Sequence, residues 1–364
     1  MYTDSRKLPY CLAINEALYQ AMDADGSVFV IGQGVKSPWY VGKTVAGLLK
    51  KFGEDRIIDT PVSENAVTGA GVGAAIAGMR PIVVHPRLDF MLYALDPIIN
   101  EAANWHYMFG GRASCPVVIW GIVNRGGEQG AQHSQSIHSI FAHVPGLKVV
   151  MPSTPYDAKG LMISAIRDEN PVIFIDDRWL YEEEGEVPTQ MYAVPIGKGK
   201  IRRNGKDLTL VSASYMMIET MKAAAALEKS GIDAEVIDLR TIKPLDTELL
   251  LESVRKTGRL VIADGGWKMC GIASEISALI AENAFGCMKA PVARVTLPDV
   301  PAPASRTLEK RYYPDHETIV KAARGVLEIS ILRNPKNREA YKQDVSERKV
   351  RKLSQAVQAA QEGV

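Results

Sequence analysis

The sequence predicts an α/β protein with two stacked domains, each built on a largely parallel sheet. Three observations support this fold class. The first half of the chain alternates short apolar, β-rich runs with longer segments of helical spacing. A stretch rich in proline, glycine and basic residues then interrupts the alternation. A second, shorter alternation of strands and helices follows.

The first domain is expected over residues 1–186. It opens with an amphipathic helix at 12–22 and a strand at 27–31 that ends at a glycine. Further buried strands are predicted at 81–84, 116–120, 148–151 and 172–175. Segments with the length and spacing of helices lie between them, at 65–78, 91–108 and 156–168.

Residues 187–206 are expected to form an interdomain linker, with a short hairpin as one option. The second domain is expected over 207–330. Its predicted elements are strands at 208–212, 234–238, 259–263 and 291–296 and helices at 216–230, 247–257 and 274–284. Residues 331–364 form a basic extension that is either a solvated tail or a docking arm for a partner.

Composition excludes several classes of protein. Of the 364 residues 46% are hydrophobic, and the formal net charge of +1 gives no field that would favour nucleic acid or an anionic membrane. No apolar run reaches the roughly 18 residues that a membrane span needs. The four cysteines lie far apart, which argues against a disulfide framework and metal knuckles. A cytoplasmic protein is therefore expected.

A carboxylate marks the first candidate site. Glu64 stands where an extended run, 57–60, meets a helix rich in glycine and alanine. Small residues allow such a helix to approach another backbone closely. Taken alone, Glu64 suits a surface or capping carboxylate better than a catalytic one.

A polar, glycine-bearing loop, 126–135, carries the second candidate, His133. Loops at strand ends of α/β sheets are where ligands bind, and a histidine there could donate a proton or cap a helix. His138 and His143 follow at intervals of five residues, which do not share one helical face, so a metal site is disfavoured. Phe90, taken alone, suits a core position at the mouth of a helix.

Taken together, the segments resemble the β subunit of the decarboxylating component of 2-oxo acid dehydrogenases, the family of pyruvate, branched-chain and acetoin dehydrogenases. The resemblance runs from about residue 8 to about residue 327. The motifs that carry it are RIIDTPVSE at 56–64, AIAGMRPI at 75–82, AQHSQ at 131–135, PGLKVVMP at 145–152, DAKGL at 157–161, AIRDENP at 165–171, VIDLRTIKPLD at 236–246 and PDVP at 298–301.

The resemblance implies a transketolase-like pyrimidine-binding domain followed by a transketolase C-terminal-type domain. It implies that Glu64 hydrogen-bonds the aminopyrimidine of thiamine diphosphate, that Phe90 stacks on this ring, and that His133 lies near the reacting acyl group. A potassium site is also implied, held mainly by backbone carbonyls. The matching positions are Val117, Ala165, Ile166, Asp168 and Asn170.

A missing motif matters as much as the matches. The sequence has no Gly-Asp-Gly followed about thirty residues later by Asn-Asn, the pattern that binds the magnesium diphosphate in this superfamily. The resemblance therefore implies an α subunit that holds the diphosphate and Mg²⁺, most simply in an α2β2 tetramer. It further implies a lipoyl acyltransferase partner.

Two departures from the family pattern bear on substrate choice and proton relay. Gln33 and Gly34 replace an acidic pair after the first strand, which could alter proton relay between sites. Arg87 is new in its region and could bind a second carboxylate or phosphate of the substrate, or form a salt bridge with Asp89 or a neighbouring subunit. A split transketolase or carboligase subunit and a non-catalytic assembly subunit remain the alternative functions.

Overall fold

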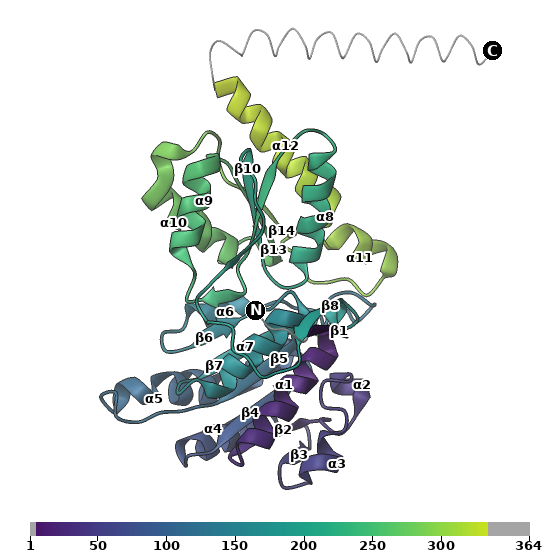
Figure 1. The fold of residues 1–364 in the computed structure, drawn as a ribbon, viewed down its shortest axis with the longest axis vertical. Coiled ribbons are helices and arrows are strands. Elements are labelled where there is room, and N and C mark those ends of the chain that lie inside the picture. The colour runs from purple at the N-terminus through teal and green to yellow at the C-terminus, as the bar shows by residue number, and fades with distance from the viewer. Residues whose placement is uncertain (1–4, 334–364) are drawn as a thin grey trace, which may run out of the picture.

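The computed structural model describes residues 5–333 and shows two α/β layers stacked end to end (Figure 1). The N-terminal half forms the lower layer of the view and the C-terminal half the upper layer. The basic extension expected at 331–364 lies almost wholly outside the described residues. Within the described part, no helix combines the length and apolarity that crossing a bilayer requires.

The lower layer is built on a seven-stranded sheet whose strands are parallel except at one edge. Five of its strands are buried runs of β-branched and aromatic side chains, which is typical of a parallel sheet covered on both faces. From edge to edge the strands are β12 (Thr241–Lys243), β6 (Lys148–Val150), β7 (Val172–Asp177), β5 (Val118–Val123), β4 (Arg80–His85), β2 (Val28–Gln33) and β3 (Ile57–Thr60).

Helices cover both faces of this sheet, as the sequence predicted. On one face α1 (Tyr10–Ala24) packs on α7 (Pro155–Arg167), and both contribute to one hydrophobic core. On the other face lie α4 (Glu64–Ile76), η1 (Leu88–Ala94), η2 (Asp96–Ala102) and α5 (Ala103–Met108). Short segments complete the layer: α2 (Pro38–Val41), α3 (Leu48–Phe52), α6 (His138–His143) and η3 (Arg178–Leu180).

The single helix predicted over 91–108 is wrong in detail. The structure divides this segment into a 3₁₀ turn, a π-helical turn and a short α-helix. Pro97 lies inside the π-helical turn, and because proline has no backbone N–H it cannot complete a regular α-helical ladder. The apolar spacing of the segment still directs its inner face to the core.

The upper layer is a five-stranded sheet with helices on both faces. In order its strands are β14 (Ala293–Leu297), β13 (Leu260–Trp267), β10 (Leu208–Ser212), β11 (Ala234–Asp238) and β9 (Lys200–Arg203). The helices are α8 (Met216–Glu228), α9 (Thr247–Thr257), α10 (Ile272–Ala284), α11 (Arg306–Tyr312) and α12 (His316–Arg333), with a 3₁₀ turn, η4 (Phe285–Cys287), after α10. The predicted strands and helices of this half are all present, and two of the strands have the predicted bounds.

The optional hairpin in the linker is wrong. β8 (Glu184–Pro188) pairs with β1 (Ser5–Pro9) in a separate two-stranded sheet, whereas β9 joins the upper sheet beside β11. Conversely, β12 belongs to the second half of the sequence but pairs with β6 at the edge of the lower sheet. The chain therefore crosses between the layers in both directions.

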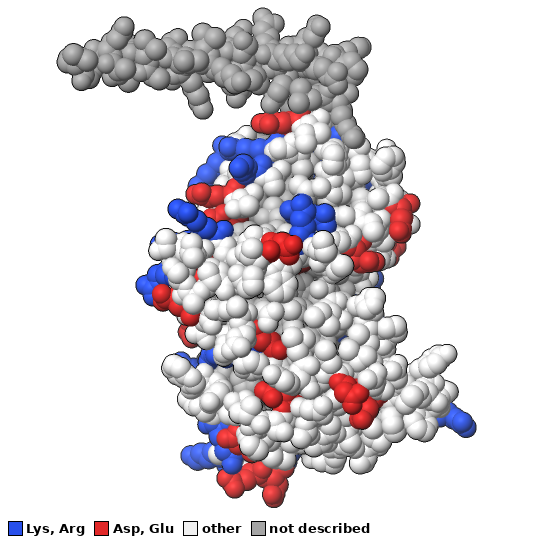
Figure 2. Space-filling view, turned by 180° about the vertical axis from the view of Figure 1, so that it is seen from behind, with Lys and Arg blue, Asp and Glu red and all other residues white. Residues whose placement is uncertain are grey.

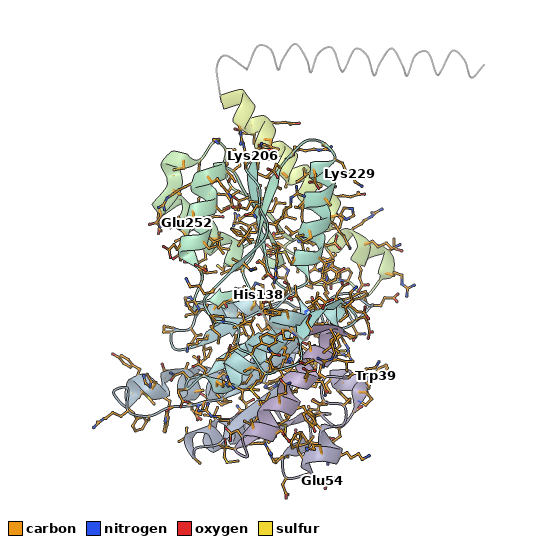
Figure 3. The ribbon with its side chains drawn as sticks, viewed as in Figure 1. Trp39, Glu54, His138, Lys206, Lys229 and Glu252 are labelled. Atoms are coloured by element: carbon orange, nitrogen blue, oxygen red, sulfur yellow. The ribbon has the colours of Figure 1, made fainter. Side chains whose placement is uncertain are left out.

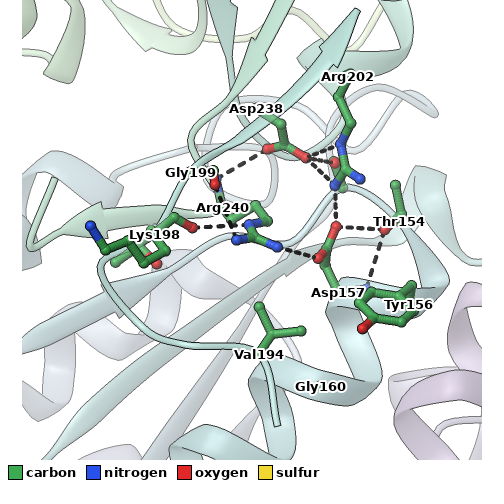
Figure 4. Close-up of polar contacts among 12 residues, drawn as sticks. Thr154, Tyr156, Asp157, Gly160, Val194, Lys198, Gly199, Arg202, Asp238 and Arg240 are labelled. Carbon is green, nitrogen blue, oxygen red and sulfur yellow. Dashed lines mark hydrogen bonds and ion pairs between the residues drawn. The ribbon is translucent and has the colours of Figure 1, made fainter. Parts of the chain in front are cut away.

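A buried ion network joins the two layers at this crossing (Figure 4). The Asp157 carboxylate at the start of α7 binds the guanidinium of Arg202 on β9 and, at 3.0 Å, that of Arg240. Arg202 also binds Asp238 at 2.6 Å. Both carboxylates are completely buried. Asp157 lies in the DAKGL motif and Asp238 in the VIDLR motif, so two family motifs serve to hold the domains together.

Lysine, arginine, aspartate and glutamate side chains are mixed over the face seen in Figure 2, with no field of one sign. This agrees with the formal net charge of +1. The site must therefore be sought in local geometry rather than in a charged surface.

Candidate active site at the carboxyl edge of the lower sheet

The predicted site residues follow the carboxyl ends of neighbouring strands. β3, β2, β4, β5 and β7 are adjacent and parallel, so their carboxyl ends share one edge of the sheet. Glu64 follows β3, Phe90 follows β4 and His133 lies in the loop after β5. In open α/β sheets this edge is where ligands bind.

Glu64 is the first residue of α4, and three residues separate it from the extended run that ends at Thr60. Its side chain is half-buried, and within residues 5–333 no donor binds its carboxylate. The neighbouring residues Val62, Ser63 and Asn65 are exposed. Glu64 is thus partly open to solvent, and its hydrogen-bonding capacity is unused among the described residues.

Two contacts fix the beginning of α4 beside β4. Thr68, one turn after Glu64, shares a hydrogen bond of 3.0 Å with His85 Nε2 at the end of β4. Burial lowers the pKa of His85 to about 4, so this imidazole is neutral at pH 7. At Gly71 a Cβ atom would lie 2.4 Å from Val83, so only glycine lets the helix lie this close to the strand.

Phe90 and His133 lie side by side, although 43 positions separate them in the sequence. Their rings meet edge to face, with centroids 5.2 Å apart and planes at 82°. Asp89 holds this arrangement, because its carboxylate accepts hydrogen bonds from the backbone N–H (3.1 Å) and side-chain amide (2.8 Å) of Gln135. The core position suggested for Phe90 taken alone is wrong, since its ring is half-buried at the edge of the sheet.

Arg87 does not form the predicted salt bridge with Asp89, whose carboxylate is bound to Gln135 instead. Its guanidinium donates to the carbonyl of Pro86 at 2.7 Å and to Gln129 Oε1 at 3.5 Å. Burial, and next the nearby Arg178 cation, lower the pKa of Arg87. Burial likewise raises the pKa of Asp89.

The histidine loop is also held from the upper layer, which the sequence did not indicate. The Tyr313 hydroxyl accepts a hydrogen bond from the Gly126 N–H at 2.8 Å, and the carboxylate of Glu309 accepts one from the Glu128 N–H at 2.8 Å. Arg306 pairs with the Glu128 carboxylate at 3.0 Å. These partners lie 178 to 187 residues away, so no local signal could have identified them.

His138 lies at the boundary between the layers (Figure 3). Its Nε2 atom is 3.1 Å from Asp264 on β13, and its Nδ1 atom is 3.1 Å from the Ser136 hydroxyl. These groups line a small interdomain cavity of about 30 Å³, room for about two water molecules. His133 and His138 therefore have different partners, and in residues 5–333 no group of three or more histidine, cysteine or acidic side chains is arranged to hold a metal ion.

The five positions matched to a potassium site lie at one corner of the lower layer, between α7 and the starts of β5 and β7. They are Val117, Ala165, Ile166, Asp168 and Asn170. Arg80 already donates to the carbonyl oxygens of Ile166 (3.0 Å) and Asp168 (3.2 Å). Asn170 Oδ1, by contrast, is buried with no hydrogen-bond partner among the described residues. One oxygen of this corner therefore still lacks a donor or a cation.

Comparison with known families defines the class first. The family described as the transketolase pyrimidine binding domain matches residues 6–183, and the transketolase C-terminal domain matches residues 197–319. A solved chain described as a split-gene transketolase, inactive β4 tetramer, superposes with a TM-score of 0.71 over 89% of this chain and 99% of its own, at 22% identity. The protein is thus a two-domain member of the transketolase-like class.

Relatives define the particular family. The β subunit of acetoin:2,6-dichlorophenolindophenol oxidoreductase of Cupriavidus necator is 49% identical, over 89% of this chain and 98% of its own length. The β subunit of the pyruvate dehydrogenase E1 component of Rickettsia felis is 43% identical over 88% and 98%. The 2-oxoisovalerate dehydrogenase β subunit of Bacillus subtilis is 42% identical over 88% and 99%. The chain belongs to the β-subunit family of the thiamine-diphosphate-dependent 2-oxo acid dehydrogenases.

Proposed function

We propose that this chain forms half of the active site of a 2-oxo acid dehydrogenase, which decarboxylates a pyruvate-like 2-oxo acid and passes the acyl group to lipoamide. One observation carries the proposal: an unpaired carboxylate, Glu64, shares the carboxyl edge of the sheet with the adjoining rings of Phe90 and His133. A split transketolase is disfavoured, because the sequence identity to the split-gene transketolase is 22%, whereas the identity to the relatives named as β subunits is 42–49%.

The residues present suit thiamine diphosphate, which supplies an electron sink when bound. Glu64 would accept or share a proton at the pyrimidine ring nitrogen, because no donor within residues 5–333 occupies its oxygens. Phe90, whose ring is half-buried beside His133, would offer a ring face for stacking. His133 would donate a proton or hydrogen bond near the reacting carbonyl.

An α subunit is proposed to complete the site. It would hold the diphosphate and Mg²⁺, for which this sequence lacks the motif, and it would cover Glu64. Three large apolar side chains on this side of the sheet are exposed to solvent. The exposed fraction is 67% for Val62 before α4, 72% for Tyr93 in η1 and 88% for Tyr107 in α5. Such a surface favours a protein interface. An α2β2 assembly that works in the cytoplasm with a lipoyl acyltransferase is part of the proposal.

Reconstitution tests the proposal. The purified chain should show no 2-oxo acid decarboxylation, and co-expression with an α-type subunit carrying the Gly-Asp-Gly motif should give a complex that decarboxylates with reduction of lipoamide. Release of CO₂ is measured over a panel of 2-oxo acids. Acetoin is included because of the 49% relative, and since it has no carboxylate its cleavage is followed by acetaldehyde release and lipoamide reduction. Full turnover by the isolated chain, or aldehyde ligation without lipoamide reduction, would contradict the assignment.

We further propose that a potassium ion binds at the corner containing Asn170. The carbonyls of Val117 and Ala165 and the unpartnered Asn170 oxygen would hold it, beside the carbonyls that Arg80 contacts. At a potassium concentration about 100-fold above its dissociation constant, binding should stabilise the fold by about 2.7 kcal/mol. Thermal unfolding in potassium, sodium and choline chlorides measures this. Equal midpoints in the three salts, or an undiminished potassium effect in Asn170→Ala, would exclude the site.

A further inference from the structure

We propose that Arg87 and Arg178 form a subsite for a second anionic group on the substrate. This rests on the proposed function and specifies its substrate class: 2-oxo acids that carry a distal carboxylate or phosphonate-like group. The subsite would lie at the same edge of the lower sheet as Glu64, Phe90 and His133.

The topology brings the two arginines toward each other. Arg87 follows β4, and Arg178 follows β7 as the first residue of η3. Only β5 lies between these strands, so their ends are roughly 10 Å apart, which two arginine side chains can span from opposite sides. Phe90 is three residues beyond Arg87, so Arg87 lies beside the candidate active site.

Gln129 connects Arg87 with the cavity that Arg178 lines. Gln129 Oε1 lies 3.5 Å from Arg87 Nη2, and Gln129 and Arg178 line the same open cavity of about 380 Å³. The Arg178 guanidinium also lies 6.0 Å from the centre of the Tyr181 ring, and both Arg178 and Tyr181 act electrostatically on Arg87. Arg178 therefore borders the hollow, and Arg87 reaches its wall through Gln129.

Neither cation has an ion-pair partner among the described residues. Within residues 5–333, Arg87 and Arg178 form no ion pair and donate to neutral carbonyls, those of Pro86 (2.7 Å) and Trp39 (2.6 Å). The Nε atom of Arg87 is buried and has no partner in this part of the chain. Bringing two half-buried cations together without a counter-charge costs free energy, which a bound anion would offset.

The nearby carboxylates form no ion pair with either arginine among the described residues. Asp89 acts electrostatically on Arg87, but its Oδ1 atom is bound to Gln135, and Glu182 lines the cavity but is exposed. Burial raises the pKa of Asp176 to about 7, so this carboxyl is only partly ionised near neutral pH. Asp177, whose pKa burial raises to about 6, stays largely ionised, and the cation that acts on it is Arg125. A bound external anion would supply the ion pair that both arginines lack.

Guanidinium chemistry and the size of the hollow define the ligand. A planar guanidinium binds carboxylate or phosphonate oxygens through paired N–H groups, which a substrate with an apolar end cannot use. A cavity of about 380 Å³ accommodates the short tail of a 2-oxo acid, and Asn124 supplies a neutral amide at its wall. Pyruvate has no distal group that could reach the arginines.

The test uses the chain reconstituted with its α subunit and thiamine diphosphate. Matched pairs are compared by kcat/KM for CO₂ release: 2-oxoglutarate with 2-oxopentanoate and 2-oxoadipate with 2-oxohexanoate, while 2-oxo-4-phosphonobutanoate tests a phosphonate. We expect the dianionic member to be preferred by at least about tenfold. Arg87→Gln and Arg178→Gln should each lower this preference by about 10- to 100-fold, because a hydrogen bond to a charged group is lost.

Controls separate substrate binding from folding and assembly. Arg255→Gln, on the exposed face of α9, should leave the preference unchanged. Arg87→Lys keeps the charge but loses the paired geometry, so its preference should fall between those of wild type and Arg87→Gln. Size-exclusion chromatography and thermal unfolding follow each variant, and Arg178→Gln carries the test if Arg87→Gln fails to fold.

Each outcome decides the proposal. Preference for uncharged tails in the wild type, or an unchanged preference in both glutamine variants, overturns the subsite while the dehydrogenase assignment stands. The subsite is also overturned if a variant partly loses the α subunit but its intact complex still prefers the dianionic substrate. The arginines would then serve the contact between the subunits. If the reconstituted complex is inactive on every 2-oxo acid, both the proposed function and the subsite are refuted.

Discussion

Replacing Glu64 with glutamine should reduce decarboxylation by the reconstituted complex about 100- to 10,000-fold, the range over which positioned acid–base groups act. Glu64 is the first residue of α4 and has no partner in the described part of its own chain, so its carboxylate is available to hold a proton at the pyrimidine ring nitrogen. A glutamine amide keeps the shape and a hydrogen bond but cannot exchange that proton.

The loss should lie in cofactor activation rather than in folding. Hydrogen–deuterium exchange at the thiazolium carbon, followed by NMR, should slow together with turnover, while the unfolding midpoint and assembly stay as in wild type. Glu54→Gln is the matched control, because Glu54 is an 80%-exposed carboxylate of the same domain (labelled in Figure 3). Turnover in Glu64→Gln within threefold of wild type would refute the role of this carboxylate.

Replacing Asp157 with alanine should destabilise the chain by about 3–5 kcal/mol, the cost of removing one partner from a buried ion pair. Arg202 and Arg240 would then face each other without the carboxylate that lies between them (Figure 4). Because these residues join α7 to β9 and the turn after β11, the loss should also loosen the two layers.

Chemical denaturation measures the loss of stability, and limited proteolysis of the connector between β8 and β9 reports the loosening. Asp157→Asn should recover part of the loss, since an amide oxygen can still accept one guanidinium hydrogen bond. Glu54→Ala, which removes an exposed pair with Lys36, should leave the denaturation midpoint in place. A midpoint for Asp157→Ala as high as that of the Glu54 variant would show that the network does not hold the layers together.

Much of the fold could be predicted because it follows local rules. The strands at 208–212 and 234–238 and the helix at 247–257 have the predicted bounds, since a buried apolar run or an amphipathic period lies between clear start and stop signals. The helix at 247–257 begins after Asp246, which caps it, and ends before Gly258, which adopts φ 72°.

Strands that depend on distant partners could not be predicted. β12 is only three residues long, and it is a strand because it pairs with β6, about ninety positions earlier in the sequence. β9 lies in a basic stretch without apolar alternation, and its pairing with β11 alone makes it a strand. The same holds for β1, whose partner β8 is far along the chain.

The sequence by itself determined the class of the protein and its candidate chemistry. Glu64, Phe90 and His133 could be named because each lies in or beside a motif that strand and helix signals place at the end of a strand. Tertiary structure alone decided that Phe90 meets His133, that Asp89 binds Gln135 rather than Arg87, and that Arg87 donates to Gln129. Local propensity acts over a few residues, whereas these contacts join side chains that only the order of strands in the sheet brings together.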